Sequence, residues 1–150
     1  MTKSKQFFVF RLDDRRYGIP LSSVDRVISA VEITPVPGAA DTVKGIINVR
    51  GHVLPIVDIR KIFRLGEREI DIDDCILIAR IRKRLFGLVI DSVVGVIDAD
   101  ENEILSADNI VPGTEFITDI VKHEGGMVLV NDLDKCLSED DMQQFDIVVM

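Results

Sequence analysis

The stretch FRLDDRRYGIPLSSVDRVI (Phe10–Ile28) returns without a gap as ARIRKRLFGLVIDSVVGVI (Ala79–Ile97). Each copy places two apolar runs around a short charged turn, which is the pattern of a β-hairpin. The identical pairs are Arg11/Arg80, Arg15/Arg84, Gly18/Gly87, Ser23/Ser92, Val24/Val93, Val27/Val96 and Ile28/Ile97. These seven identities favour one hairpin-based unit used twice over the alternative of two unrelated amphipathic hairpins.

A second, weaker repeat sets Gly51–Ile59 (GHVLPIVDI) against Gly125–Leu133 (GGMVLVNDL). Short runs rich in Val, Ile and Phe between polar or Gly-containing turns predict strands throughout the chain. The predicted strands are Phe7–Leu12, Tyr17–Leu21, Gly45–Val49, Val53–Val57, Cys75–Ile81, Leu85–Ile90, Phe116–Val121 and Met127–Val130. Short helices are predicted at Asp58–Phe63 and Asp132–Leu137, and Ser138 resembles the N-cap of a C-terminal helix over residues 138–147. The spacing favours an all-β barrel or sandwich over βαβ units.

Composition is that of a small soluble domain with an acidic surface. The chain has 150 residues, a net charge of −8, an isoelectric point near 4.7 and no Trp. A general binder of nucleic acid or anionic membranes needs a basic face, so neither is expected as a partner. No apolar run reaches the length of a membrane span or of a signal peptide, so we expect a cytoplasmic protein with free thiols at Cys75 and Cys136.

Charge is divided unevenly between the two halves of the chain. Residues 1–70 carry a net charge of +4, whereas residues 71–150 carry −12. Such a charge dipole suits docking against oriented partners, with electrostatic steering that weakens as salt rises. Two halves that are merely solvated differently explain the same asymmetry equally well.

The residues offer no constellation that points to catalysis, a metal or a cofactor. His52 and His123 lie in or beside predicted turns, without a third ligand at zinc spacing. The acidic stretch from Asp98 resembles a calcium loop but has Glu103 where the turn needs Gly and Asn109 where the bidentate Glu belongs. We therefore expect no catalytic, cofactor or metal residues. A hydrolase with paired carboxylates stays an alternative that would need two carboxyl groups facing each other in a cleft.

A recognition surface is predicted at the turn that follows Lys44-Gly45-Ile46-Ile47-Asn48-Val49-Arg50-Gly51. Gly51 supplies the positive φ that a tight turn needs, and Asn48 can hydrogen-bond the turn backbone. Arg50 then projects from the tip with a planar guanidinium suited to a carboxylate. Taken alone, Arg50 is more simply explained as a solvated turn residue.

At this stretch the sequence resembles the CheW family of bacterial chemotaxis coupling proteins. The resemblance rests on the combination of Lys44–Gly51 with Pro55-Ile56-Val57-Asp58-Ile59. It continues through Tyr17-Gly18-Ile19, Ile33–Pro37, Phe86–Val93 and Leu129–Leu133, so it covers the chain from about Phe7 to Leu137. It implies an all-β fold of two SH3-like five-stranded barrels, with short helices and a C-terminal helix.

The same resemblance implies a single CheW-like domain with a first barrel at about residues 10–70, completed by strand exchange from the termini, and a second at about 71–137. It implies a non-catalytic adaptor between the cytoplasmic tip of a chemoreceptor and the regulatory domain of the histidine kinase CheA. In the family, the first barrel docks the kinase and the groove between barrels takes the receptor helices. The implied interface residues are Val24, Lys44, Gly45, Asn48, Arg50, Gly51, Asp91, Val93 and Val94.

One position departs from the family pattern. The family has an acidic residue two positions after the valine that corresponds to Val24, whereas this sequence has Arg26. Because a charge reversal is a means of rejecting wrong partners, Arg26 indicates an accessory adaptor with a complementary acidic partner, such as one of a non-flagellar chemosensory pathway. A small-barrel module that binds other proteins is the remaining alternative.

Overall fold

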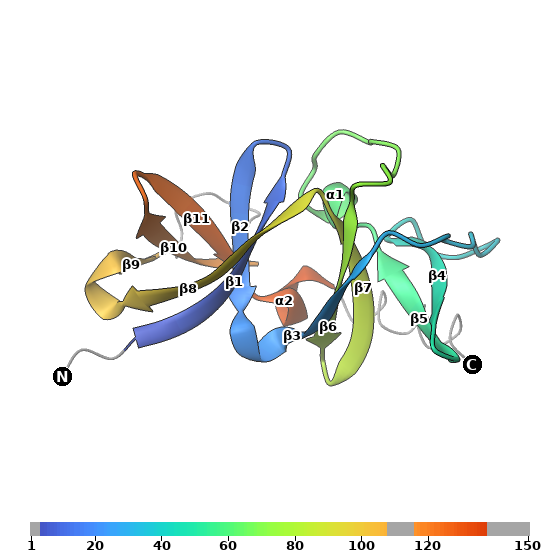
Figure 1. Ribbon diagram of the computed structural model, residues 1–150, viewed down its shortest axis with the longest axis horizontal. Coiled ribbons are helices and arrows are strands. Elements are labelled where there is room, and N and C mark those ends of the chain that lie inside the picture. Colours follow the sequence, from blue (N-terminus) through green and yellow to red (C-terminus); the bar gives the residue numbers. More distant parts are fainter. Residues whose placement is uncertain (1–3, 108–115, 138–150) are drawn as a thin grey trace. The chain divides into compact units, whose positions relative to one another are not determined.

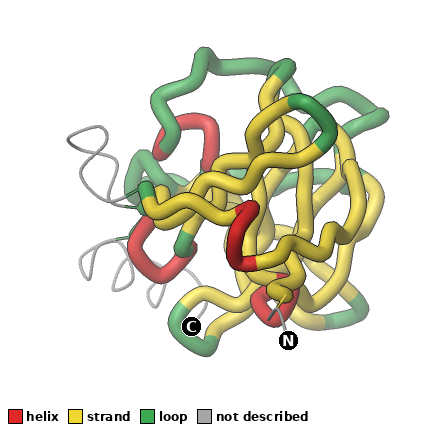
Figure 2. The backbone as a smooth tube through the Cα atoms, turned by 90° about the vertical axis from the view of Figure 1, so that its left-hand side faces the viewer, coloured by secondary structure: helices red, strands yellow, loops and turns green. Residues whose placement is uncertain are grey.

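The computed structural model describes residues 4–107 and 116–137, and strands make up most of this part of the chain (Figures 1 and 2). The predicted C-terminal helix at 138–147 lies outside the described residues. The described strands are β1 (Ser4–Leu12), β2 (Arg15–Pro20), β3 (Val24–Ser29), β4 (Val43–Val49), β5 (His52–Val57), β6 (Cys75–Ile81), β7 (Arg84–Ile90), β8 (Ser92–Asp100), β9 (Ile104–Ser106), β10 (Ile117–His123) and β11 (Gly126–Asn131). Short helices are α1 (Ile59–Ile62) and α2 (Leu133–Cys136), with 3-10 turns η1 (Leu21–Ser23) and η2 (Glu101–Glu103).

The strands form two sheets, one in each of two compact units. Unit 1 ends at Val24 and resumes over Asp91–Cys136; it holds a six-stranded sheet in the order β8-β1-β2-β11-β10-β9. Unit 2 comprises Asp25–Ile90 and a C-terminal remainder that begins at Leu137; it holds a five-stranded sheet in the order β3-β6-β7-β5-β4. The all-β class and the two modules expected from the sequence are confirmed, and the sheet of unit 1 has one strand more than expected.

The two sheets repeat one pairing scheme. The hairpins β1–β2 and β6–β7 are antiparallel, and each is followed by a parallel pair, β2 with β11 and β7 with β5. The third strand of each sequence repeat leaves its own hairpin: β3 lies beside β6, and β8 pairs with β1. This reciprocal exchange explains why the units interleave in sequence.

The observed units divide the chain differently from the two barrels that the resemblance implies, one at about 10–70 completed by strand exchange from the termini and one at about 71–137. The hairpin β1–β2 belongs with β8–β11, and β3–β7 form the other unit. The physical reason is that a strand pairs through its backbone edge, so the local sequence of β3 or β8 does not show which of two similar hairpins it will join.

Each unit has its own apolar cluster. In unit 1 it consists of buried residues from β1, β8, β10 and β11: Phe7, Val9, Ile97, Ala99, Val121, Val128 and Val130. In unit 2 it consists of Ile47, Ile56, Ile76 and Ile78, from β4, β5 and β6. Members of one strand are spaced by two residues, because alternate side chains of a strand point to the same face.

Helix α1 starts where the sequence indicates. Asp58 is its N-cap, and the carboxylate Oδ1 accepts the backbone N–H of Lys61 at 3.2 Å. Both short helices are within a residue or two of the expected positions. Over the described ranges, no helix has the length and apolar character needed to cross a membrane.

Candidate functional site

The β4–β5 hairpin of unit 2 carries five of the predicted interface residues. Its turn has Arg50 at φ 51° and Gly51 at φ 85°, the two positive values of a type I′ turn. Asn48 Oδ1 accepts the backbone N–H of Gly51 at 2.8 Å and stabilises this turn. Arg50 is exposed at the tip, as expected from the sequence. Holding a non-glycine residue in this region costs about 1–2 kcal/mol, so the rest of the hairpin must stabilise it.

Gly45 is buried and has a structural role at the start of the same hairpin. The backbone of Thr34 passes so close that an added Cβ would overlap its carbonyl oxygen and lie 2.7 Å from Ile33 Cγ2. Thr34 and Ile46 exchange two backbone hydrogen bonds here, each 2.9 Å long. The absence of a side chain at Gly45 therefore allows the segment after β3 to join β4 and link the two outer strands of the sheet.

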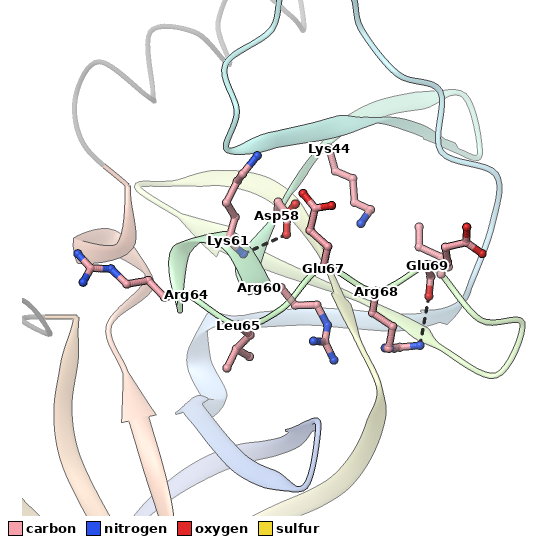
Figure 3. A pocket seen from close by; sticks show the side chains of 10 residues that line it. Lys44, Asp58, Arg60, Lys61, Arg64, Leu65, Glu67, Arg68 and Glu69 are labelled. Atoms are coloured by element: carbon pink, nitrogen blue, oxygen red, sulfur yellow. Dashed lines mark hydrogen bonds between the residues drawn. The ribbon is translucent and has the colours of Figure 1, made fainter.

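Lys44 is half-buried and borders a hollow of about 820 Å³ within unit 2. The remaining lining residues come from α1 and the segment after it: Asp58, Arg60, Lys61, Arg64, Leu65, Glu67, Arg68, Glu69 and Ile70. Figure 3 shows Glu67 beside Lys44 and Asp58, whereas Arg64 extends away from them. The lining therefore carries both basic and acidic side chains.

Arg26 forms an ion pair with the neighbouring Asp25. Its Nε donates to Asp25 Oδ2 at 2.9 Å, and the other oxygen of Asp25 accepts from Arg80 Nη2 at 3.0 Å. The carboxylate is only 17% exposed, while both arginine side chains are about half exposed. This group of one acid and two bases leaves a positive surface on β3 and β6. Arg80 is not among the predicted site residues, and its identity with Arg11 is only one of the seven in the repeat.

The remaining predicted residues lie in unit 1, where Val24 is the last residue of the first segment and also begins β3. Asp91 Oδ2 accepts the backbone N–H of Asp13 at 2.7 Å, in the β1–β2 turn where Asp13 has φ 56°. Asp91 thus supports a turn. Val93 and Val94 are exposed on β8, at a bulge in the pairing with β1.

Two exposed apolar residues beside these positions were missed by sequence reasoning. Val96 on β8 is 52% exposed, and Val53 on β5, which pairs with Asn48, is 44% exposed. The run Val53–Val57 is apolar at every position, so alternation gives no signal that Val53 is exposed. The structure thus places predicted residues on each unit, five of them together on one hairpin.

In the described ranges, no group of three or more His, Cys, Asp or Glu side chains is positioned to hold a metal ion. Burial, with smaller contributions from the negative charges of Asp132 and Asp134, raises the pKa of the Cys136 thiol to about 12. This thiol is neutral at physiological pH, and its Sγ donates to the carbonyl of Asp132 at 3.5 Å.

The family model described as the CheW-like domain matches residues 6–141. The chain belongs to the CheW-like family. It is 31% identical over 141 residues to the chemotaxis protein CheW of Bacillus subtilis, with 93% of this chain and 90% of the relative covered. Protein FrzA of Myxococcus xanthus is 28% identical over 133 residues, with 85% of this chain and 80% of FrzA covered.

A solved CheW structure matches the fold as well. The scaffolding protein TtCheW from Thermoanaerobacter tengcongensis superposes with a TM-score of 0.83 at 31% identity, covering 93% of this chain and 96% of TtCheW. The resemblance noted in the sequence is thereby confirmed. The comparison concerns the fold and the family, and the individual interface residues stay predictions.

Proposed function

We propose that this CheW-like chain couples the cytoplasmic tip of a chemoreceptor to the regulatory domain of the histidine kinase CheA. The chain is an adaptor of chemotaxis-type signal transduction, the class of function that its relatives support. We infer further that it acts in the cytoplasm, carries out no catalysis and is recruited to receptor arrays through these two partners.

The observation that carries the proposal is the display of Arg50 on the β4–β5 hairpin. The type I′ turn and the Asn48–Gly51 hydrogen bond fix the backbone before any partner arrives. A preorganised guanidinium loses less freedom on binding and offers five donors in a planar fork to a carboxylate. Exposed Val53, paired with Asn48, adds an apolar contact to the same hairpin. The hairpin therefore suits a protein surface that combines an acidic group with an apolar one.

A second surface, on unit 1, supports a bridging role. Val93, Val94 and Val96 are between 39% and 52% exposed on β8. An amphipathic helix can bury its apolar side against such a strand. We assign the β4–β5 hairpin, with Arg50 at its tip, to the kinase and the β8 valines to the receptor. A protein that binds two partners at once needs two separate binding surfaces, and this assignment gives one to each unit.

The positive group around Asp25 favours an accessory adaptor as a variant of this function. Arg26 stands where the resemblance implies an acidic residue, and Arg80 adds a second guanidinium to the same carboxylate. We propose that the cognate partner presents an acidic surface to β3. An Arg26→Glu variant that binds its own kinase as well as the wild type does would refute this assignment.

The test of the main proposal is a pull-down with the CheA regulatory domain and a receptor tip fragment from the same genome. Arg50→Glu and Lys44→Glu should each weaken kinase binding, while binding to the receptor tip and the circular dichroism spectrum stay those of the wild type. Lys83→Glu, which reverses another exposed charge of unit 2, is the matched control and should bind normally. If neither Arg50→Glu nor Lys44→Glu alters an interaction, the assigned surface is wrong.

A further inference from the structure

The segment from Gly66 to Asp74, GEREIDIDD, joins α1 to β6 and exposes apolar and acidic side chains together. We call it the acidic loop. Ile72 is 89% exposed and Ile70 is 36% exposed. The exposed carboxylates that flank them belong to Glu67, Glu69, Asp71 and Asp73. A single exposed isoleucine is ordinary on a protein surface. Ile72 differs in that buried groups hold the loop that carries it.

Buried charged side chains anchor the acidic loop at both ends. Arg60, 8% exposed, donates from Nη1 to the carbonyl of Gly66 at 3.0 Å. Asp74, 4% exposed, accepts from Arg68 Nη2 and from the backbone N–H of Asp71, both at 2.8 Å. Burying charge is unfavourable unless partners compensate it, and here both buried groups bind the loop.

Additional backbone contacts fix the same segment. Asp71 accepts twice, from the N–H of Asp73 at its Oδ1 and from the N–H of Asp74 at its carbonyl, both at 3.0 Å. The carbonyl of Asp74 in turn accepts the N–H of Ala30 at 3.1 Å, which ties the end of the loop to the segment after β3. The conformation that presents Ile72 is therefore set on folding, and a partner does not have to order it.

The chemistry of the loop defines the surface it fits. An isoleucine that enters an apolar depression loses its water-exposed area, which stabilises a complex. Carboxylates around it favour arginine or lysine side chains at the rim of that depression and repel an acidic rim. Ile70 and Glu69 also line the hollow beside Lys44, so the loop continues the surface assigned to the kinase.

We propose that the acidic loop is a docking element that inserts Ile72 into an apolar depression rimmed by basic side chains on the kinase regulatory domain. The choice of partner rests on the proposed function. The loop contributes affinity through Ile72 and contributes salt-sensitive orientation through its carboxylates.

The test is isothermal titration calorimetry of the CheA regulatory domain into the full chain at two salt concentrations. Ile72→Ser should weaken binding by about 10- to 100-fold, the range expected for a buried aliphatic side chain. The double variant Glu69→Gln with Asp71→Asn should bind more weakly at low salt and show a smaller salt dependence. Both changes are at exposed positions, and unchanged thermal unfolding will show that the fold is intact.

Met127→Ser is the matched control, because Met127 is 63% exposed on unit 1. It should leave the affinity unchanged. Equal binding by Ile72→Ser and the wild type, or an equal loss in Met127→Ser, overturns the docking role while the adaptor function stands. If the wild type binds neither the kinase domain nor the receptor tip, the proposed function fails, and the assignment of the loop fails with it.

Discussion

Replacing Gly45 by alanine should destabilise unit 2 because a backbone, rather than a movable side chain, occupies the space that the new Cβ needs. The overlap is with the carbonyl oxygen of Thr34, which is held by hydrogen bonds to Ile46. Separating the two strands to relieve it breaks both bonds, at about 0.5–1.5 kcal/mol each. Gly45 also has φ 155°, which costs alanine on the order of 1–3 kcal/mol. Together these effects amount to about 2–6 kcal/mol, a large part of the stability of a domain.

The assay is thermal and urea unfolding of Gly45→Ala beside the wild type. For a chain of this size each kcal/mol lowers Tm by about 2–4 °C, so a decrease of at least about 4 °C is expected. Gly66→Ala is the matched control, because no atom lies within 4 Å of its added Cβ and its φ is outside the left-handed region. It should leave stability unchanged or raise it by about 0.4–1 kcal/mol. A Gly45→Ala protein with the wild-type Tm would refute the role assigned to this close approach.

Three further outcomes follow from contacts described above. Asp25→Asn should lower stability by roughly 1–2 kcal/mol in urea unfolding, because it removes the carboxylate that two arginines share; a wild-type midpoint would contradict this. Above about pH 9 the Cys136 thiol ionises in the unfolded chain but stays protonated in the folded one. The free energy of unfolding should therefore fall between pH 9 and 12, and it should fall less in Cys136→Ala. Parallel curves of unfolding free energy against pH for the two proteins would rule out a contribution from this thiol. Asn48→Ala should speed hydrogen exchange at the Gly51 amide, and equal exchange rates would show that the turn does not need this bond.

Local features of the fold could be predicted because their causes lie within a few residues. The Arg50–Gly51 turn follows from a glycine between two apolar runs, and Asp58 caps α1 where a strand gives way to a helical pattern. Cys75–Ile81 forms the predicted strand with the same bounds. In each case the backbone geometry or the side-chain alternation can be predicted from the residues next to it in the sequence.

The strands β3, β8 and β9 were missed for a common reason. Each stands at an end of its sheet, and β3 and β9 have no fully buried residue. Half-exposed edge strands lack the continuous apolar run that marks a central strand. In β8 the pattern is further interrupted by the bulge at Val94 and by Gly95 at φ 138°. The sequence repeat did include these segments, but similarity between two copies does not show that either is extended.

In the candidate site, too, local features could be predicted from the sequence and long-range contacts could not. Arg50 and Asn48 could be assigned from the turn alone, whereas the sharing of Asp25 by Arg26 and Arg80 joins residues 55 positions apart. The ion pair between Arg68 and the buried carboxylate of Asp74, which holds the acidic loop, likewise depends on how deeply Asp74 is buried. Burial and long-range ion pairs are properties of packing that residue types do not reveal.

By itself, the sequence determined the hairpins, the turn at Arg50, the doubled module and the family to which the chain belongs. Only the tertiary structure decided which hairpin each third strand joins, why Gly45 must lack a side chain, and which charges are neutralised. Turn geometry and alternation act over a few residues and leave a local pattern. Strands pair through backbone edges that are alike in every strand, so the local sequence of a strand does not show which partner it will have. The partner is set by the packing of the whole sheet.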